Sequence, residues 1–262
     1  MPYTNSRNLR FVYTGYSDGY TNMAIDEAIL IGLNEGVSEP ILRIYKWDPP
    51  TISIGYFQKI DDIDTEKCQK DGIMIVRRLT GGRAVLHDIE LTYSILFTNE
   101  DFKPFKKKEI FQYIASALTE SLTMLGIDAK MAEKSRGDLK SPNCFASPAQ
   151  YEIETSEKQK LIGSAQVIKG KVVLQHGAIP LTSAYSRIDK YLKKNKSGIK
   201  SATSLSERSG RKIEDKDLLK ALKEGFKRFF PLEESSLTKY EMDLTEKLVK
   251  EKYSTDRWNR MR

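Results

Sequence analysis

Two adjacent glycines, Gly81 and Gly82, interrupt a run of strand-forming residues and constrain the chain more than any other feature. Residues 73–78 before them are rich in Ile, Met and Val, and residues 84–87 after them are again mostly apolar. This pattern predicts two β-strands separated by a turn whose backbone can adopt conformations that side chains forbid. Another strand is expected at residues 91–97, where apolar side chains alternate along the chain. The middle of the sequence is therefore expected to form a sheet that is broken by a glycine turn.

The rest of the chain alternates between helical and strand-like patterns, without an internal repeat. A helix is expected to begin at a Thr21 or Asn22 cap and to run through Leu33. A short helix at residues 64–70 is expected to stop at Gly72. The remaining expected elements are strands at residues 41–47, 51–56, 159–168 and 172–181 and helices at residues 109–125, 215–229 and 238–252. This order predicts an α+β fold, in which helices flank a mixed sheet built mainly from hairpins.

The two apolar runs at residues 159–168 and 172–181 are expected to pair as a hairpin. Lys169 and Gly170 lie between them, but lysine is a poor occupant of the positive-φ position of a two-residue turn, and a four-residue loop is equally open. Beyond residue 183 the pattern becomes helical. We therefore expect a single catalytic domain over residues 1–262, with a strand-rich core at about residues 1–182 and a helical C-terminal part at about residues 183–262.

The composition indicates a soluble, cytoplasmic protein. No apolar run reaches the roughly 18 residues that span a bilayer, and the first residues lack the apolar stretch of a secretory signal. Cys68 and Cys144 cannot form a disulfide framework, and beside only two histidines they are not spaced like metal ligands. A net charge of +7 suits an acidic partner. No nucleic-acid-binding consensus is present, so neither nucleic acid nor a membrane is expected as that partner.

The segment at residues 77–88 carries the strongest chemical signal. Paired glycines let the backbone approach a ligand closely and expose its N–H groups, while Arg78 and Arg83 can hold phosphate or carboxylate oxygens in a fork. An acyl or phosphopantetheine-bearing ligand could bind to these N–H groups and arginines. An isolated Gly-Gly dipeptide more often marks an ordinary turn, so the alternative of a turn flanked by surface arginines stays open.

The residues that follow, 88–94 with the sequence DIELTYS, make the block similar to a family signature. Residues 77–94 resemble the pattern RRxTGGRAVLHxxELTYS of bacterial octanoyltransferases that are related to lipoate ligases. Further similarity to this family lies, in family order, at residues 22–28, 53–58, 163–166, 174–177 and 253–259. The resemblance implies the catalytic-domain fold of the lipoate and biotin protein ligase superfamily over essentially the whole chain.

Cys144 lies in a segment, residues 141–148, that shows neither helical nor strand periodicity. A cysteine in an exposed loop does not behave as a small core residue, and a thiolate can attack an acyl thioester in a nearly thermoneutral exchange. A lone cysteine without other evidence is more often inert and packed. Residues 144–148 resemble the family's CFxSP motif, which implies that Cys144 is the nucleophile. Cys68 has no motif around it and keeps the inert interpretation.

Lys160 begins a predicted strand beside glycine and small residues. An ammonium at such a position can lie close to a thiol and favour its ionised form, or it can face the developing oxyanion of an acyl carbonyl. A lysine at the end of a strand more commonly extends into solvent. The resemblance implies the functional role and makes Cys144 and Lys160 the catalytic residues.

The same resemblance implies a set of substrate-binding residues around this pair. They are Arg78, Gly81, Gly82, Arg83, Ala84, His87, Gly163, Ser164 and His176. His87 is expected at the wall of the acyl pocket, and the role of His176 stays open, because either histidine can equally be structural. Part of the apolar core must open to admit an octanoyl chain.

The resemblance implies a double displacement without a metal or cofactor. Cys144 would take octanoyl from an acyl carrier protein and pass it to a lysine of a lipoyl-carrier protein, such as the glycine-cleavage H protein or a 2-oxoacid dehydrogenase acyltransferase subunit. A lipoate-protein ligase that uses ATP and Mg²⁺ is the first alternative, and Arg83 counts against it because ligases usually continue with a third glycine there. An amidotransferase that moves octanoyl between carrier domains and a non-catalytic carrier-domain binder are two further alternatives.

Overall fold

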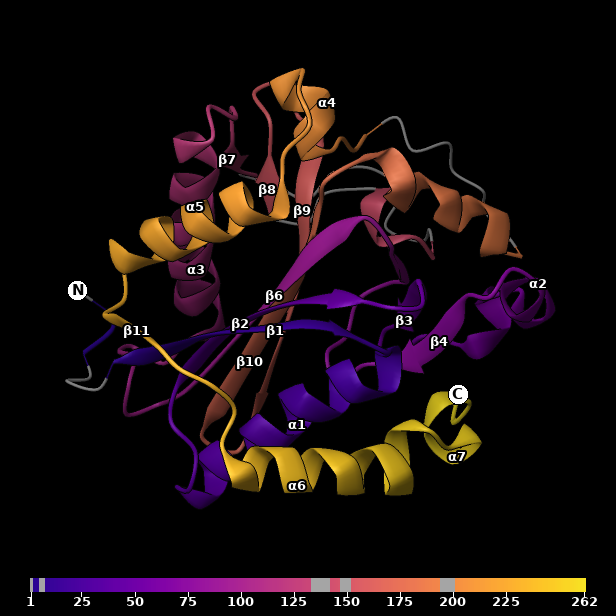
Figure 1. Cartoon of the computed structure of the whole chain (residues 1–262), viewed down its shortest axis with the longest axis horizontal. Coiled ribbons are helices and arrows are strands. Elements are labelled where there is room, and N and C mark those ends of the chain that lie inside the picture. The colour runs from indigo at the N-terminus through magenta and orange to yellow at the C-terminus, as the bar shows by residue number, and fades with distance from the viewer. Residues whose placement is uncertain (1, 5–7, 133–141, 147–151, 194–200) are drawn as a thin grey trace.

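The strands of the protein are divided between two sheets (Figure 1). The computed structural model describes residues 2–4, 8–132, 142–146, 152–193 and 201–262. In these ranges the larger sheet has the order β11-β1-β2-β6-β10-β9-β8-β7, and the smaller one has the order β4-β3-β5. The strands are β1 (Leu9–Ser17), β2 (Ile41–Trp47), β3 (Thr51–Ile54), β4 (Met74–Arg77), β5 (Val85–His87), β6 (Glu90–Thr98), β7 (Lys130–Met131), β8 (Ile153–Glu154), β9 (Lys160–Lys169), β10 (Val172–Pro180) and β11 (Leu232–Glu234).

Parallel pairing sets this topology apart from the expected series of hairpins. Strand β1 is parallel to β2 and β11, and β3 is parallel to β4. A parallel pair needs a crossover, and the connections contain α1 (Gly19–Glu35) between β1 and β2, and η1 (Ile60–Asp62) and α2 (Thr65–Lys70) between β3 and β4. The expectation of a sheet built mainly from hairpins is therefore wrong, whereas the α+β fold with a mixed sheet is confirmed.

Helices cover both faces of the larger sheet (Figure 1). One face packs against α3 (Lys107–Met124) and α5 (Asp215–Lys227), and the other packs against α1, which in turn contacts α6 (Lys239–Leu248). Strand β6 shows why both faces need cover. Its Tyr93, Ile95 and Phe97 belong to the core beneath α3 and α5, whereas Leu96 belongs to the core beneath α1.

The start of α1 differs from the expected cap. Asp18 is the N-cap residue, and its side chain accepts a hydrogen bond from the backbone N–H of Thr21. Asn22 is fully buried within the helix and donates to the backbone carbonyls of Ser17 and Lys46. The expected Thr21 or Asn22 cap is therefore wrong, because Asp18 supplies the acceptor earlier and Asn22 is needed to join the helix to the sheet.

The hairpin between β9 and β10 turns one residue later than the sequence suggested. Lys169 pairs directly with Val172, so Gly170 and Lys171 form a two-residue turn. Gly170 has a φ of 59°, and lysine therefore avoids the positive-φ position that made a Lys169-Gly170 turn unfavourable. The predicted hairpin is confirmed, and the four-residue alternative is wrong.

In the described ranges 183–193 and 201–262, most elements are helices, with one strand among them. The elements are η3 (Ser183–Tyr191), α4 (Leu205–Ser209), α5, β11, α6, η4 (Val249–Tyr253) and α7 (Asp256–Asn259). Strand β11 returns to the larger sheet beside β1. The helical part therefore contributes an edge strand to the core sheet.

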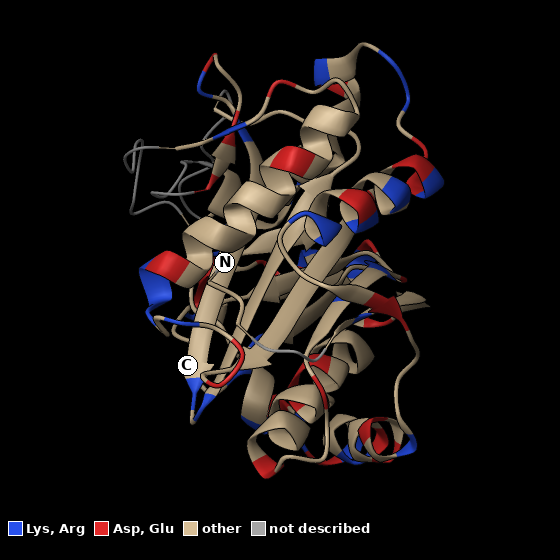
Figure 2. Cartoon of the chain, turned by 90° about the vertical axis from the view of Figure 1, so that its left-hand side faces the viewer, with Lys and Arg blue, Asp and Glu red and all other residues tan. Residues whose placement is uncertain are grey.

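Charged residues lie mainly on helices and loops. Figure 2 shows Lys and Arg interspersed with Asp and Glu over one side of the molecule. In the described ranges, no helix has both the length and the apolar character needed to cross a membrane.

Arg77 on β4 holds the C-terminal helix α7 in place. Its fully buried guanidinium donates to the backbone carbonyls of Gly55 (2.8 Å), Gln58 (2.7 Å) and Asn259 (3.0 Å). The Trp258 indole N–H returns a bond of 2.9 Å to the Arg77 carbonyl. One side chain thus joins the loop after β3 to the end of the chain.

We predict that Arg77→Met lowers the free energy of unfolding by roughly 3 kcal/mol, because buried carbonyls lose their donors. Chemical denaturation measures the change, and hydrogen exchange should rise at residues 55–58 and 256–259. Arg228→Met is the matched control, since Arg228 is exposed and pairs only with Glu120 at the surface; it should cost no more than about 1 kcal/mol. Equal losses from both variants would contradict this role of Arg77.

Candidate active site

A small, mostly apolar cavity lies where β2, β6, β9 and β10 meet the smaller sheet. Its wall includes six of the predicted site residues, namely Arg78, His87, Cys144, Gly163, Ser164 and His176. The cavity measures about 30 Å³, which is room for a water molecule or two but not for an octanoyl chain. A chain of that size could enter only if the wall opened, and such an opening stays a prediction.

Cys144 is held at this wall by a short backbone pairing. Its backbone N–H donates to the carbonyl of Ala84 (3.0 Å), and the Ala84 N–H donates to the carbonyl of Pro142 (2.9 Å). Cys144 begins the short helix η2 (Cys144–Ala146) and is partly buried, so the expectation of an exposed loop cysteine is wrong. The motif positions Ser141, Ser147 and Pro148 lie outside the described residues.

Lys160 reaches Cys144 from the first position of β9. Its fully buried ammonium lies 3.6 Å from the Cys144 Sγ and donates to the Cys144 carbonyl at 2.9 Å. Its third partner is the Glu152 carboxylate, 2.7 Å away and equally buried. A buried ammonium needs such a counterion. Glu152 was not identified from the sequence, because no motif links it to Lys160.

Gly163 keeps the space between the two catalytic candidates open. A Cβ at this position would lie 3.4 Å from the Cys144 Sγ and 3.2 Å from the Lys160 Cε. Its neighbour Ser164 bonds to the hydroxyl of Tyr93 (2.8 Å) and also lines the cavity. A side chain at position 163 would therefore crowd the space between the thiol and the ammonium.

Arg78 organises the glycine turn. Its guanidinium has five N–H donors, and all have partners in the protein. The acceptors are the Ser53 carbonyl and hydroxyl, the carbonyls of Gly81 and Arg83, and the Thr80 hydroxyl, at 2.8–3.2 Å. Burial lowers the pKa of Arg78 to about 10. The side chain thus lines the cavity while its hydrogen bonds shape the loop.

The glycine turn faces a second, open groove. Gly81, Gly82 and Ser164 line it together with Lys107 and Lys169, and Ser164 is shared with the small cavity. Gly82 has a φ of 91°, and a Cβ there would lie 2.9 Å from the Arg78 guanidinium, so glycine is required twice over. The groove and the cavity therefore share a wall at Ser164 and Ala165 of β9.

The remaining predicted residues of this segment lie beside the turn. Arg83 is partly exposed, and Ala84 is buried against the backbone of Cys144. His87 is buried at the cavity wall, where its ring stacks on Trp47 at a centroid distance of 4.0 Å. The structure therefore places His87 at the wall of the small cavity, and its contact with an acyl chain stays a prediction.

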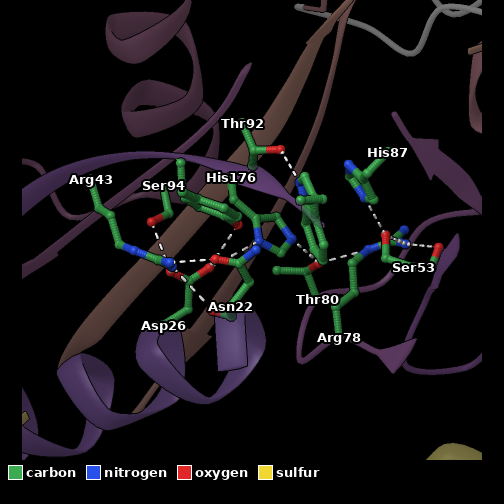
Figure 3. A network of polar contacts seen from close by, with 12 residues as sticks. Asn22, Asp26, Arg43, Ser53, Arg78, Thr80, His87, Thr92, Ser94 and His176 are labelled. Carbon is green, nitrogen blue, oxygen red and sulfur yellow. Dashed lines mark hydrogen bonds and ion pairs between the residues drawn. The ribbon is translucent and has the colours of Figure 1, made fainter. Parts of the chain in front are cut away.

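His176 belongs to a polar network around Asp26 (Figure 3). Its Nε2 lies 2.7 Å from the Thr80 hydroxyl, and its Nδ1 lies 3.4 Å from Asp26. Asp26 also accepts hydrogen bonds from Arg43 (2.9 Å) and Ser94 (2.8 Å). The sequence analysis quoted residues 22–28 as a motif but did not identify Asp26 as the centre of this network.

Two opposed effects set the ionisation of this buried pair. Burial alone would raise the pKa of Asp26, but hydrogen bonds and charge from His176, Arg43 and Ser94 together hold it below its ordinary value. Burial lowers the pKa of His176, and the Asp26 carboxylate offsets only part of that change. His176 is therefore neutral near pH 7, and it joins α1 to the Thr80 loop.

The chain is similar to proteins of lipoyl metabolism along its whole length. Residues 18–227 match the family described as "Lipoyl protein ligase A/B catalytic domain". The chain is 39% identical over 272 residues to octanoyltransferase LipM of Clostridioides difficile, covering 97% of this chain and 98% of that one. It is 37% identical over 270 residues to octanoyltransferase LipM of Geobacillus kaustophilus, covering 95% and 97%.

Solved structures of ligases share the fold. A putative lipoate protein ligase of Thermoplasma acidophilum with bound lipoic acid superposes with a TM-score of 0.81 and 27% identity, covering 98% of this chain and all of that chain. A lipoate-protein ligase A bound with ATP also gives a TM-score of 0.81 and 27% identity, covering 97% and 99%.

The depressed pKa of His176 predicts a pH dependence of stability. Above an ordinary histidine pKa of about 6.5 both the folded and the unfolded states hold it neutral, and its full contribution is present. As the pH falls below that value, the unfolded chain takes up a proton that the folded chain excludes, which costs up to about 1.4 kcal/mol per pH unit. His176→Gln should therefore flatten the decline in unfolding free energy between pH 7.5 and 5.5. Parallel curves for both proteins would refute this.

Proposed function

The chain belongs to the LipM octanoyltransferases within the lipoyl protein ligase A/B catalytic domain family, and we propose that it moves octanoyl from an acyl carrier protein, through Cys144, to a lysine of a lipoyl-carrier protein. Octanoyl transfer in protein lipoylation needs an acyl donor and a lipoyl-domain acceptor. For the acceptor we propose the glycine-cleavage H protein or a 2-oxoacid dehydrogenase acyltransferase subunit.

The observation that carries this proposal is the approach of Lys160 to Cys144. The ammonium lies 3.6 Å from the Sγ, at the wall of a mostly apolar cavity. In the first half-reaction the Cys144 thiolate attacks the thioester carbonyl carbon, and the donor's thiolate leaves. The nearby ammonium attracts negative charge both on the sulfur and on the tetrahedral intermediate.

The open groove supports a role in holding the donor. It shares Ser164 with the cavity and runs past Gly81 and Gly82, and Lys107 and Lys169 are the charged residues that line it in the described part of the chain. A phosphopantetheine arm carries a phosphate, and cationic rims attract such a group and the acidic protein that carries it. We propose that this groove, with Arg83 beside it, receives the arm while its acyl end enters the cavity.

A lipoate-protein ligase remains the second candidate, because the solved ligases share this fold at a TM-score of 0.81. It would need ATP and Mg²⁺ and no acyl-cysteine. The paired Cys144 and Lys160 favour the transferase, since a thioester intermediate requires a nucleophile that an adenylate mechanism does not use. Arg83, where the ligase pattern has a third glycine, adds bulk to the turn. We propose that the reaction proceeds without a metal or cofactor.

We predict that mixing the protein with octanoyl-carrier protein gives an enzyme heavier by one octanoyl group, and that Cys144→Ala abolishes both this adduct and transfer. Cys68→Ala is the matched control and should retain the adduct and near wild-type transfer. Burial raises the pKa of Cys68 to about 12, so its thiol stays protonated and inert. Intact-mass spectrometry after a short incubation measures the adduct.

Two results would contradict the assignment of Cys144. One is an octanoyl adduct that persists in Cys144→Ala, and the other is an equal loss of transfer in the two cysteine variants. Either result would show that the nucleophile lies elsewhere.

A further inference from the structure

A chain of three polar side chains runs from the cavity wall into the core. Ser53 on β3 lines the cavity, and its hydroxyl lies 2.8 Å from Nε2 of His87 on β5. The Nδ1 of the same ring lies 2.7 Å from the carboxylate of Glu90 at the start of β6. All three side chains are buried, and Figure 3 shows Ser53, His87 and their bond beside Arg78. The order hydroxyl, imidazole, carboxylate is the order of a charge-stabilised proton acceptor.

We propose that Ser53, His87 and Glu90 form a proton relay that takes the proton from the acceptor lysine during the second half-reaction. This inference rests on the proposed function, because it acts on the octanoyl thioester of Cys144. The amine nitrogen attacks the thioester carbonyl carbon, and the carbon–sulfur bond breaks to release the Cys144 thiolate. The nitrogen passes a proton to the Ser53 oxygen as the Ser53 proton moves to His87 Nε2. The resulting imidazolium faces the Glu90 carboxylate and later returns the proton to solvent.

The second half-reaction needs a base that Lys160 does not supply. An ammonium has three N–H groups, and those of Lys160 face the Cys144 carbonyl, the Cys144 Sγ and the Glu152 carboxylate. An attacking amine must still lose a proton for the amide to form, and imidazole is the side chain that most often accepts one in enzymes.

The other histidine of the cavity wall is placed less well for this task. His176 contacts the hydroxyl of Thr80, which is absent from the wall of the cavity as described. Its carboxylate partner, Asp26, also accepts hydrogen bonds from Arg43 and Ser94, and these bonds join α1 to the sheet. Ser53, by contrast, faces the cavity directly, so its oxygen can meet a nitrogen that enters there.

The surroundings of His87 fix the ring in the orientation that the relay requires. The ring is stacked on Trp47, whose indole N–H donates to Thr92 (2.8 Å), and the Thr92 hydroxyl in turn donates to Glu90. The charged or titratable groups that face the relay from neighbouring elements are Arg78, Tyr45, Cys144 and His176. With Glu90 on Nδ1, the Nε2 is left to accept from Ser53.

Single-turnover release from the octanoyl-enzyme tests the relay with two nucleophiles. The enzyme is first loaded from octanoyl-carrier protein and then mixed with apo lipoyl domain or with hydroxylamine. A lysine amine, with an ordinary pKa near 10.4, needs a base, whereas hydroxylamine is uncharged at pH 7 and its adduct loses a proton readily to water. Once loaded, His87→Gln should release octanoyl to the lipoyl domain about 100-fold more slowly than wild type, within the range of general-base catalysis. Release to hydroxylamine should change less than about threefold, because that reaction needs little general-base assistance.

Ser53→Ala provides a second variant that leaves His87 and Glu90 in place, and it should show the same split between nucleophiles. Ser121→Ala is its control, because Ser121 is also a buried serine but lies on α3, away from the residues that line the cavity. Both of its release rates should be unchanged. Equal slowing with the two nucleophiles, or no slowing with either, would overturn the relay while leaving the proposed function intact. Failure of wild-type enzyme to load would overturn both.

Discussion

The buried carboxylate of Asp26 determines how the main helix sits on the sheet. Asp26 is 1% exposed and would be costly to bury without partners. Arg43, Ser94 and His176 are direct neighbours across β2, β6 and β10, and all three contact it. Only one position of α1 along the sheet lets Asp26 contact all three of these side chains. The same row of side chains fixes the strands that form one wall of the catalytic cavity, so the position of the site follows from the burial of this charge.

Cys144 and the glycine turn lie outside the strands of this scaffold, whereas Lys160 lies at the end of one of them. Cys144 is held by a short backbone pairing with Ala84. Lys160 lies at the first position of β9 and has Glu152 as its counterion. The glycine turn is shaped by Arg78 rather than by a strand ladder. The proposed nucleophile therefore lies on a short segment beside a rigid sheet, an arrangement common in enzymes because loops can be altered without loss of the core.

Local patterns in the sequence predicted most elements, and the family resemblance implied the pairing of Cys144 with Lys160, but neither could supply long-range partners. The predicted cap at Thr21 or Asn22 failed because Asp18 competes for the same N–H groups. The smaller sheet was missed because the parallel pairing of β3 with β4 depends on a crossover, which periodicity does not reveal. Glu152 and the bond between Ser53 and His87 are tertiary contacts between residues that carry no joint motif.

The central claim, ATP-independent acyl transfer through a cysteine, is tested most directly by octanoylation of an apo lipoyl domain in reactions stripped of nucleotide. The account predicts the same rate from octanoyl-carrier protein with and without ATP and Mg²⁺, and no modification from free octanoate or lipoate. Modification that requires a free acid together with ATP would contradict the account and identify the protein as a ligase.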